Sequence, residues 1–209
     1  QWHQSKGWNG VGYTFVIKKD GTIQEGRPIW AIGAHALNGW NSKSFGVCMA
    51  GNFSQEDPTK EQIDSLTKLL AWLCVQFGLN GNDIIGHRDI NSTDCPGSRL
   101  YAQLSSIRSN VDAMLSSQAG AIESEDPLEP SEHEEPETSD ELVLKPNISE
   151  TNLKFRFPFV QRPSTSGLMV HHSASTGAND DAYAFHQWHL ARGADWSGFA
   201  DGCGAVSQR

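Results

Sequence analysis

The sequence predicts an α/β fold, in which buried β-strands alternate with amphipathic helices. A run rich in β-branched and aromatic residues predicts a strand at residues 11–18, and an apolar run that ends before Gly51 and Asn52 predicts a buried strand at residues 44–50. Between residues 57 and 77, apolar side chains recur at the spacing of one helix face, and Gly78 ends the run. Strands and helices that alternate in this way are typical of a sheet covered by helices.

The other elements follow from the same patterns. Asp57 is the expected N-cap of the first helix, with Pro58 as its first residue. Further strands are expected at residues 22–27, 83–86 and 167–171, and further helices at residues 98–115 and from residue 179 or 180 to about residue 192.

The net charge of −9 is concentrated in one stretch of the 209 residues. Residues 117–150 hold eleven of the 25 acidic residues, are rich in Ser and Pro, and have almost no aromatic side chains. Such a composition predicts a disordered linker between a body, residues 1–116, and a C-terminal segment, residues 151–209. The remainder is nearly neutral, so no nucleic-acid partner is indicated. No apolar run reaches the roughly 18 residues of a membrane span.

Two short motifs contain candidate metal ligands. His87 leaves a predicted strand, and Cys95 follows in a polar turn, whereas Cys48 and Cys74 lie in apolar runs. Neutral imidazole and thiolate are ligands that zinc takes, although a surface His beside an unrelated Cys has the same spacing. His171 and His172 end another predicted strand, where paired histidines either present a ligand or are incidental.

Several motifs together resemble the type 2 zinc N-acetylmuramoyl-L-alanine amidases, a family that includes phage lysozymes with amidase activity and peptidoglycan recognition proteins. The motifs lie at residues 11–15, 19–22, 25–27, 33–35, 44–51, 86–97 and 168–176, with Gln-Trp-His and following Gly and Trp residues. The resemblance covers residues 1–115 and about 156–198. It implies a central mixed β-sheet flanked by helices, with one zinc ion in a cleft.

The resemblance also implies roles for particular residues. The implied zinc ligands are His171, His87 and Cys95. Tyr13 and Thr93 take the places of catalytic residues, and His35 lies in a Gly-Ala-His motif that lines the substrate cleft. The implied activity is zinc-dependent hydrolysis of the amide between N-acetylmuramic acid and L-alanine in bacterial cell-wall peptidoglycan, as in an endolysin or autolysin. The alternatives are a non-catalytic peptidoglycan-binding module and an inactive fragment of a tandem amidase.

The order of the motifs departs from the family, in which the His-His strand comes first. Here it follows the acidic linker, so residues 151–209 either begin a second amidase unit or supply the missing strand and helix of the first. We expect docking in cis, as a monomer, or in trans, as a strand-swapped dimer. Gln1-Trp2-His3 is repeated at Gln187-Trp188-His189, and the chain is expected to be cut from a longer one.

Overall fold

A computed structural model describes residues 10–123, 143–155, 157–175 and 181–185 of the chain. It contains one mixed six-stranded sheet with the strand order β4-β6-β3-β1-β2-β5. The strands are β1 (Phe15–Ile17), β2 (Ile23–Glu25), β3 (Ser44–Met49), β4 (Ile84–Gly86), β5 (Ile148–Ser149) and β6 (Gly167–His172). The helices are α1 (Lys60–Phe77) and α2 (Ser98–Glu123), with short 3₁₀ turns η1 (Trp40–Ser42), η2 (Gly81–Asp83) and η3 (His87–Asp89).

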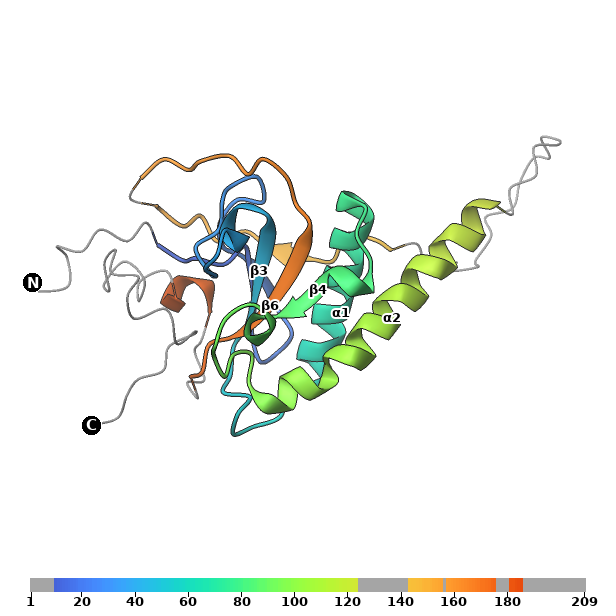
Figure 1. The fold of residues 1–209 in the computed structure, drawn as a ribbon, viewed down its shortest axis with the longest axis horizontal. Coiled ribbons are helices and arrows are strands. Elements are labelled where there is room, and N and C mark those ends of the chain that lie inside the picture. The colour runs from blue at the N-terminus through green and yellow to red at the C-terminus, as the bar shows by residue number, and fades with distance from the viewer. Residues whose placement is uncertain (1–9, 124–142, 156, 176–180, 186–209) are drawn as a thin grey trace, which may run out of the picture.

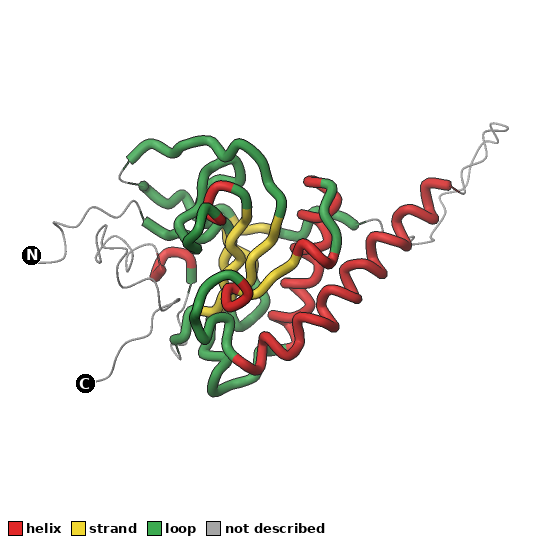
Figure 2. The backbone as a smooth tube through the Cα atoms, viewed as in Figure 1, coloured by secondary structure: helices red, strands yellow, loops and turns green. Residues whose placement is uncertain are grey.

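Helices α1 and α2 pack together on one face of the sheet, as Figures 1 and 2 show. Successive strand side chains point to opposite faces, so alternate residues of β3 and β6 reach the helices. The main core therefore joins these strand residues to the leucines of α1 and the apolar face of α2. Its strand members include Phe45, Val47, Leu168 and Val170, all fully buried.

The opposite face of the sheet carries a second, smaller apolar cluster. It contains Val16 and Cys48 from the strands, Tyr13 and Cys95 from loops, and Phe185 from a helical turn at residues 182–185. This face also receives the intervening residues of β6, among them His171. The candidate site lies here, away from the two long helices.

The segment from residue 143 to residue 172, which we call the arm, completes the sheet in two places. Val143 packs into the main core, and β5 adds a parallel strand beside β2. The arm then crosses the molecule, and β6 enters between β3 and β4, parallel to both (Figure 1). Strand β6 therefore lies in the sheet of its own chain, and the predicted mixed sheet flanked by helices is confirmed.

One buried cation fastens the arm to the body. Arg162 of the arm donates hydrogen bonds to the backbone carbonyls of Ser44 and Ala31, and its guanidinium lies 4.2 Å from the centroid of the Phe45 ring. Burial lowers the pKa of Arg162 to about 10. The side chain remains charged at neutral pH, and the two carbonyls and the ring face replace part of its water.

The structure corrects some expected boundaries. Thr59, rather than Asp57, caps α1, because its side chain accepts from Gln62 N–H while the Gln62 side chain accepts from Thr59 N–H. Helix α1 ends at Gly78 as expected, in a left-handed conformation. Two parts of the predicted disordered linker, residues 117–150, have defined structure, because α2 continues to Glu123 and residues 143–150 include β5. The remaining linker residues, 124–142, lie outside the described residues. Both Gln-Trp-His copies, and residues 186–192 of the last expected helix, lie outside the described residues.

Candidate metal centre

Three side chains from two distant parts of the chain meet on the face of the sheet opposite the long helices. The ligand atoms of His87, Cys95 and His171 all lie within 4.8 Å of one another. Their exposed fractions are 1%, 1% and 0%. Among the described residues, this is the one group of His, Cys, Asp or Glu side chains arranged to hold a metal ion.

His87 follows β4 and begins the 3₁₀ turn η3. The turn is fixed by the Asp89 carboxylate, which accepts a hydrogen bond from Gly86 N–H at 2.8 Å. The Oδ1 atom of Asn91 lies 3.1 Å from His87 Nε2. Because an amide oxygen only accepts, Nε2 carries the ring proton and Nδ1 is left with a lone pair. This buried Nδ1 has no hydrogen-bond partner within the described part of the chain.

Cys95 lies in the turn between η3 and α2, where hydrogen bonds fix both its backbone and its sulfur. Cys95 N–H donates to the Thr93 hydroxyl at 3.2 Å, and Cys95 C=O accepts from Arg88 N–H at 2.9 Å. Its sulfur accepts a hydrogen bond from His172 N–H on β6 at 3.4 Å. An N–H donor of this kind stabilises a thiolate, the form of cysteine that binds metals.

His171 reaches the cluster from the middle of the sheet. Its Nδ1 lies 3.6 Å from Cys95 Sγ, and its ring centroid lies 4.5 Å from that of His87. Its Nε2 lies 3.1 Å from Nδ1 of His35, a further buried histidine. Burial first, and then the neighbouring His171, hold the pKa of His35 well below its usual value. The neighbouring His172 faces the main core, where its Nδ1 accepts from Phe53 N–H.

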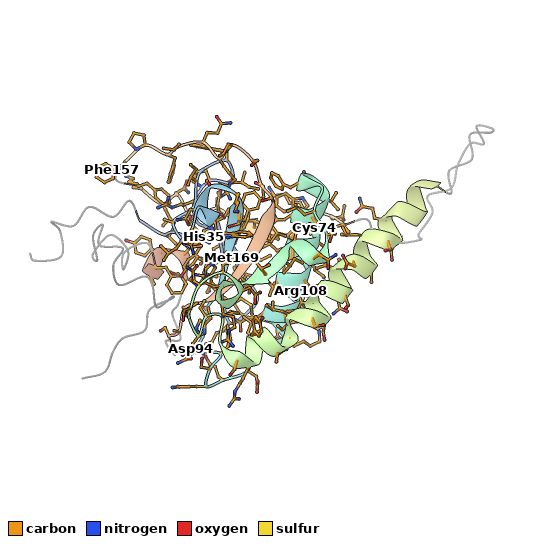
Figure 3. All side chains as sticks on the ribbon, viewed as in Figure 1. His35, Cys74, Asp94, Arg108, Phe157 and Met169 are labelled. Carbon is orange, nitrogen blue, oxygen red and sulfur yellow. The ribbon has the colours of Figure 1, made fainter. Side chains whose placement is uncertain are left out.

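The other residues singled out from the sequence surround the cluster. The Tyr13 ring is buried, with its centroid 5.2 Å from that of His171. Thr93 is half-buried and two residues from Cys95. His35 is 1% exposed, and its ring lies edge-on to His171. In Figure 3, His35 lies near the strands, whereas Cys74 is on the side that carries α1. The roles of all six residues remain predictions, although the structure brings them together.

The donor set fits a zinc ion. Two imidazoles and one thiolate are a typical three-ligand zinc set, which leaves a fourth position for a reactant. His87 Nδ1 is buried and has no hydrogen-bond partner in the described residues, and a metal ion bound between His87, Cys95 and His171 would account for this. The non-ligating nitrogens of His87 and His171 already have partners, as metal-binding histidines require.

Three contributors to the site are not apparent from sequence motifs. Asn91 orients His87, the Ser44 carbonyl lies 3.2 Å from His35 Nε2, and Arg162 binds the same carbonyl. For Asn91, the spacing of four residues after His87 is the available signal. A backbone carbonyl has no such signal, and Arg162 lies in an irregular segment with no periodic pattern.

Comparison with known proteins bears on residues 1–98 of this arrangement. These residues, which include two of the three cluster members, match the family model Amidase_2, described as N-acetylmuramoyl-L-alanine amidase. Residues 1–98 therefore resemble the N-acetylmuramoyl-L-alanine amidase family over a little less than half of the 209-residue chain. The match ends before the arm, so His171 joins His87 and Cys95 through the fold and lies outside the matched sequence.

Similar proteins come from animals, phages and bacteria. The chain is 40% identical over 106 residues to peptidoglycan-recognition protein LB of Drosophila melanogaster, covering 50% of this chain and 45% of that protein. It is 39% identical over 101 residues to the endolysin of Enterobacteria phage T3, covering 46% and 65%. The solved amidase LysC from Clostridium intestinale URNW is 38% identical, with a TM-score of 0.44, covering 47% and 65%. The chain thus spans less than two thirds of the length of each of these relatives.

Proposed function

We propose that this chain hydrolyses the amide bond between N-acetylmuramic acid and L-alanine in peptidoglycan, with one zinc ion held by His87, Cys95 and His171. The observation that carries the proposal is the convergence of these ligand atoms within 4.8 Å. The names of the amidase and endolysin relatives support the reaction and the cell wall as the place of action. Within the described residues, no helix is long and apolar enough to span a membrane.

When bound, zinc supplies Lewis acidity, which activates water at neutral pH and polarises the amide carbonyl. The chain's residues hold and orient the reactants. Tyr13 and Thr93 lie beside the cluster and are proposed to donate hydrogen bonds to the carbonyl oxygen as negative charge develops there. Burial of the three ligands excludes bulk water from them, which strengthens these interactions.

The test measures zinc and hydrolysis in the same full-length protein. Zinc content is determined by plasma mass spectrometry after dialysis, and release of stem peptides with a free L-alanine amine is followed on muramyl peptides. We expect one zinc per chain and peptide release. Cys95→Ser is expected to lose both, while Cys74→Ala, which alters a buried thiol on α1 outside the cluster, keeps both. Circular dichroism checks that both variants are folded.

Two results would contradict the proposal. The first is peptide release that persists in the Cys95→Ser protein after zinc removal by a chelator. The second is a folded, zinc-loaded chain that binds peptidoglycan and releases no peptide, which would establish a binding module instead.

A further inference from the structure

His35 is a buried histidine that contacts the proposed metal ligands without belonging to the three-residue cluster. Its Nδ1 lies 3.1 Å from His171 Nε2, and its Nε2 lies 3.2 Å from the Ser44 carbonyl oxygen. The rings of His35 and His171 meet edge-on, with centroids 5.1 Å apart at 84°. The two hydrogen bonds make His35 the middle member of a hydrogen-bond chain that runs from the Ser44 carbonyl of β3 to His171 in the cluster.

The donors and acceptors in this chain have one consistent assignment. A carbonyl oxygen only accepts, so His35 Nε2 carries the hydrogen that points at Ser44. A charged ring that is 1% exposed would have a large desolvation cost, so His35 is neutral and its Nδ1 is an acceptor. His171 must then donate from Nε2, and its Nδ1 keeps the lone pair that faces Cys95 Sγ at 3.6 Å.

Two glycines leave room for the His35 ring. A Cβ atom at Gly33 would lie 2.5 Å from His35 Cδ2, and one at Gly46 would lie 2.6 Å from His35 Cγ. Both distances are shorter than any tolerated carbon contact, so a side chain at either position would displace the ring. The space between Gly33 and Gly46 therefore confines the ring to the plane in which both of its nitrogens are bonded.

The far end of the hydrogen-bond chain is also fixed. The Ser44 carbonyl accepts from His35 and from the guanidinium of Arg162, which uses both lone pairs of the oxygen. Arg162 is held in turn by the carbonyl of Ala31 at 2.7 Å. Since Arg162 and His171 both belong to the arm, docking of the arm brings in the ligand and the group that orders its hydrogen-bond chain.

We propose that His35 is a positioning residue, which holds His171 as the Nε2–H tautomer so that the Nδ1 lone pair faces Cys95. The effect of this tautomer on zinc binding rests on the proposed function. The tautomer itself does not, because it is a property of the metal-free protein. His35 would thus act through His171, by orienting the ring and selecting its ligating nitrogen.

The first test reads the tautomer directly. Two-bond ¹H–¹⁵N correlation spectra of the full, ¹⁵N-labelled, metal-free chain at pH 8 distinguish Nε2–H from Nδ1–H imidazoles, and a His171→Gln spectrum assigns the signal. We expect His171 and His35 both as Nε2–H forms. A His171 signal of the Nδ1–H form, or of a rapidly averaged mixture, would overturn the proposal.

The second test compares two substitutions at one position. His35→Asn keeps an oxygen acceptor near the place of Nδ1, whereas His35→Leu has similar bulk and no acceptor. We expect His35→Leu to weaken zinc binding about 10- to 100-fold, as measured by chelator competition, and His35→Asn to recover most of that loss. Native affinity in folded His35→Leu, or equal losses in the two folded variants, would overturn the proposal.

The two tests also separate this inference from the proposed function. If a His35 variant does not fold, the proposal is tested by the His171 tautomer of the native protein alone. If the native chain shows the Nε2–H tautomer at His171 but binds no zinc, the proposed function fails and the positioning role stands.

Discussion

His171 Nδ1 lies 3.6 Å from Cys95 Sγ, although 76 residues separate the two in the chain. The contact exists because β6 occupies a central position between β3 and β4, with a complete parallel register to β3. The candidate site therefore depends on docking of the arm as much as on the body that carries His87 and Cys95.

Val170→Asp is expected to unfold the site by expelling β6 from the sheet. Val170 is fully buried among the strands and α1, and an unpaired carboxylate in this place costs at least about 3 kcal/mol. Urea unfolding monitored by circular dichroism measures the loss, and zinc content should fall with it. The matched control is Leu144→Asp, also in the arm but 73% exposed, which should change stability by less than about 0.5 kcal/mol. Equal effects of the two substitutions would refute a specific role for β6.

Tyr13→Phe is expected to separate hydrolysis from metal binding. The ring is 4% exposed and packed against His171, so removal of the hydroxyl leaves the packing in place. Loss of one donor to a developing oxyanion lowers kcat about 10²–10³-fold. Zinc stoichiometry should stay at the native level. Unchanged kcat with native zinc content would remove Tyr13 from the proposed catalytic residues.

Asn91→Ala is expected to weaken zinc binding through His87. Without the amide oxygen 3.1 Å from Nε2, the His87 ring loses its orientation and its preferred tautomer, and zinc affinity should fall about tenfold. Asn82→Ala on η2 serves as the control, because this asparagine is exposed and precedes β4, whereas His87 follows the other end of that strand. Equal zinc affinities of Asn91→Ala and Asn82→Ala in chelator competition would contradict the prediction.

Cys74 is expected to resist alkylation in the native chain. Burial, and then the nearby Asp83 and Asp112 carboxylates, raise the pKa of its thiol from 9.0 to about 12. The reactive thiolate is therefore scarce at pH 8, and the iodoacetamide reaction should accelerate about tenfold per pH unit below pH 12. Because the folded pKa lies above the unfolded one, this thiol also reduces stability as the pH rises from 9.0 towards 12. Peptide mapping by mass spectrometry gives the rate, and alkylation of native Cys74 at pH 8 as fast as in urea would contradict the prediction.

The local parts of the fold and site follow from the sequence. The helix of residues 60–77 and its end at Gly78 are set by a repeating apolar face and a residue that tolerates left-handed backbone. His87 and Cys95 belong to one short motif, so their proximity depends on a single turn. The first residue of α1 was predicted wrongly, because Asp57 and Thr59 are both good N-cap residues. Thr59 is the N-cap in the structure, since Gln62 completes a capping box with it.

Non-local features were less accessible. The motif order left open whether residues 151–209 complete this sheet, because register and docking depend on contacts between distant segments. The edge strand β5 was missed, since Ile148–Ser149 is too short to show any alternation and lies within residues 117–150, whose acidic composition predicted a disordered linker. The environment of His35 was equally hidden, because its hydrogen-bond chain ends on a backbone carbonyl.

The central place of β6 also sets the order of events during folding. Lys43 and Ser166, at the start of the β3–β6 pairing, are 123 residues apart, and closing so long a loop carries a large entropic penalty. Strand β6 leaves the ribosome after both of its neighbours, so β3 and β4 must wait with unpaired edges until the arm is synthesised. We therefore expect slow refolding after dilution from denaturant, with a tendency to aggregate until β6 has entered the middle of the sheet.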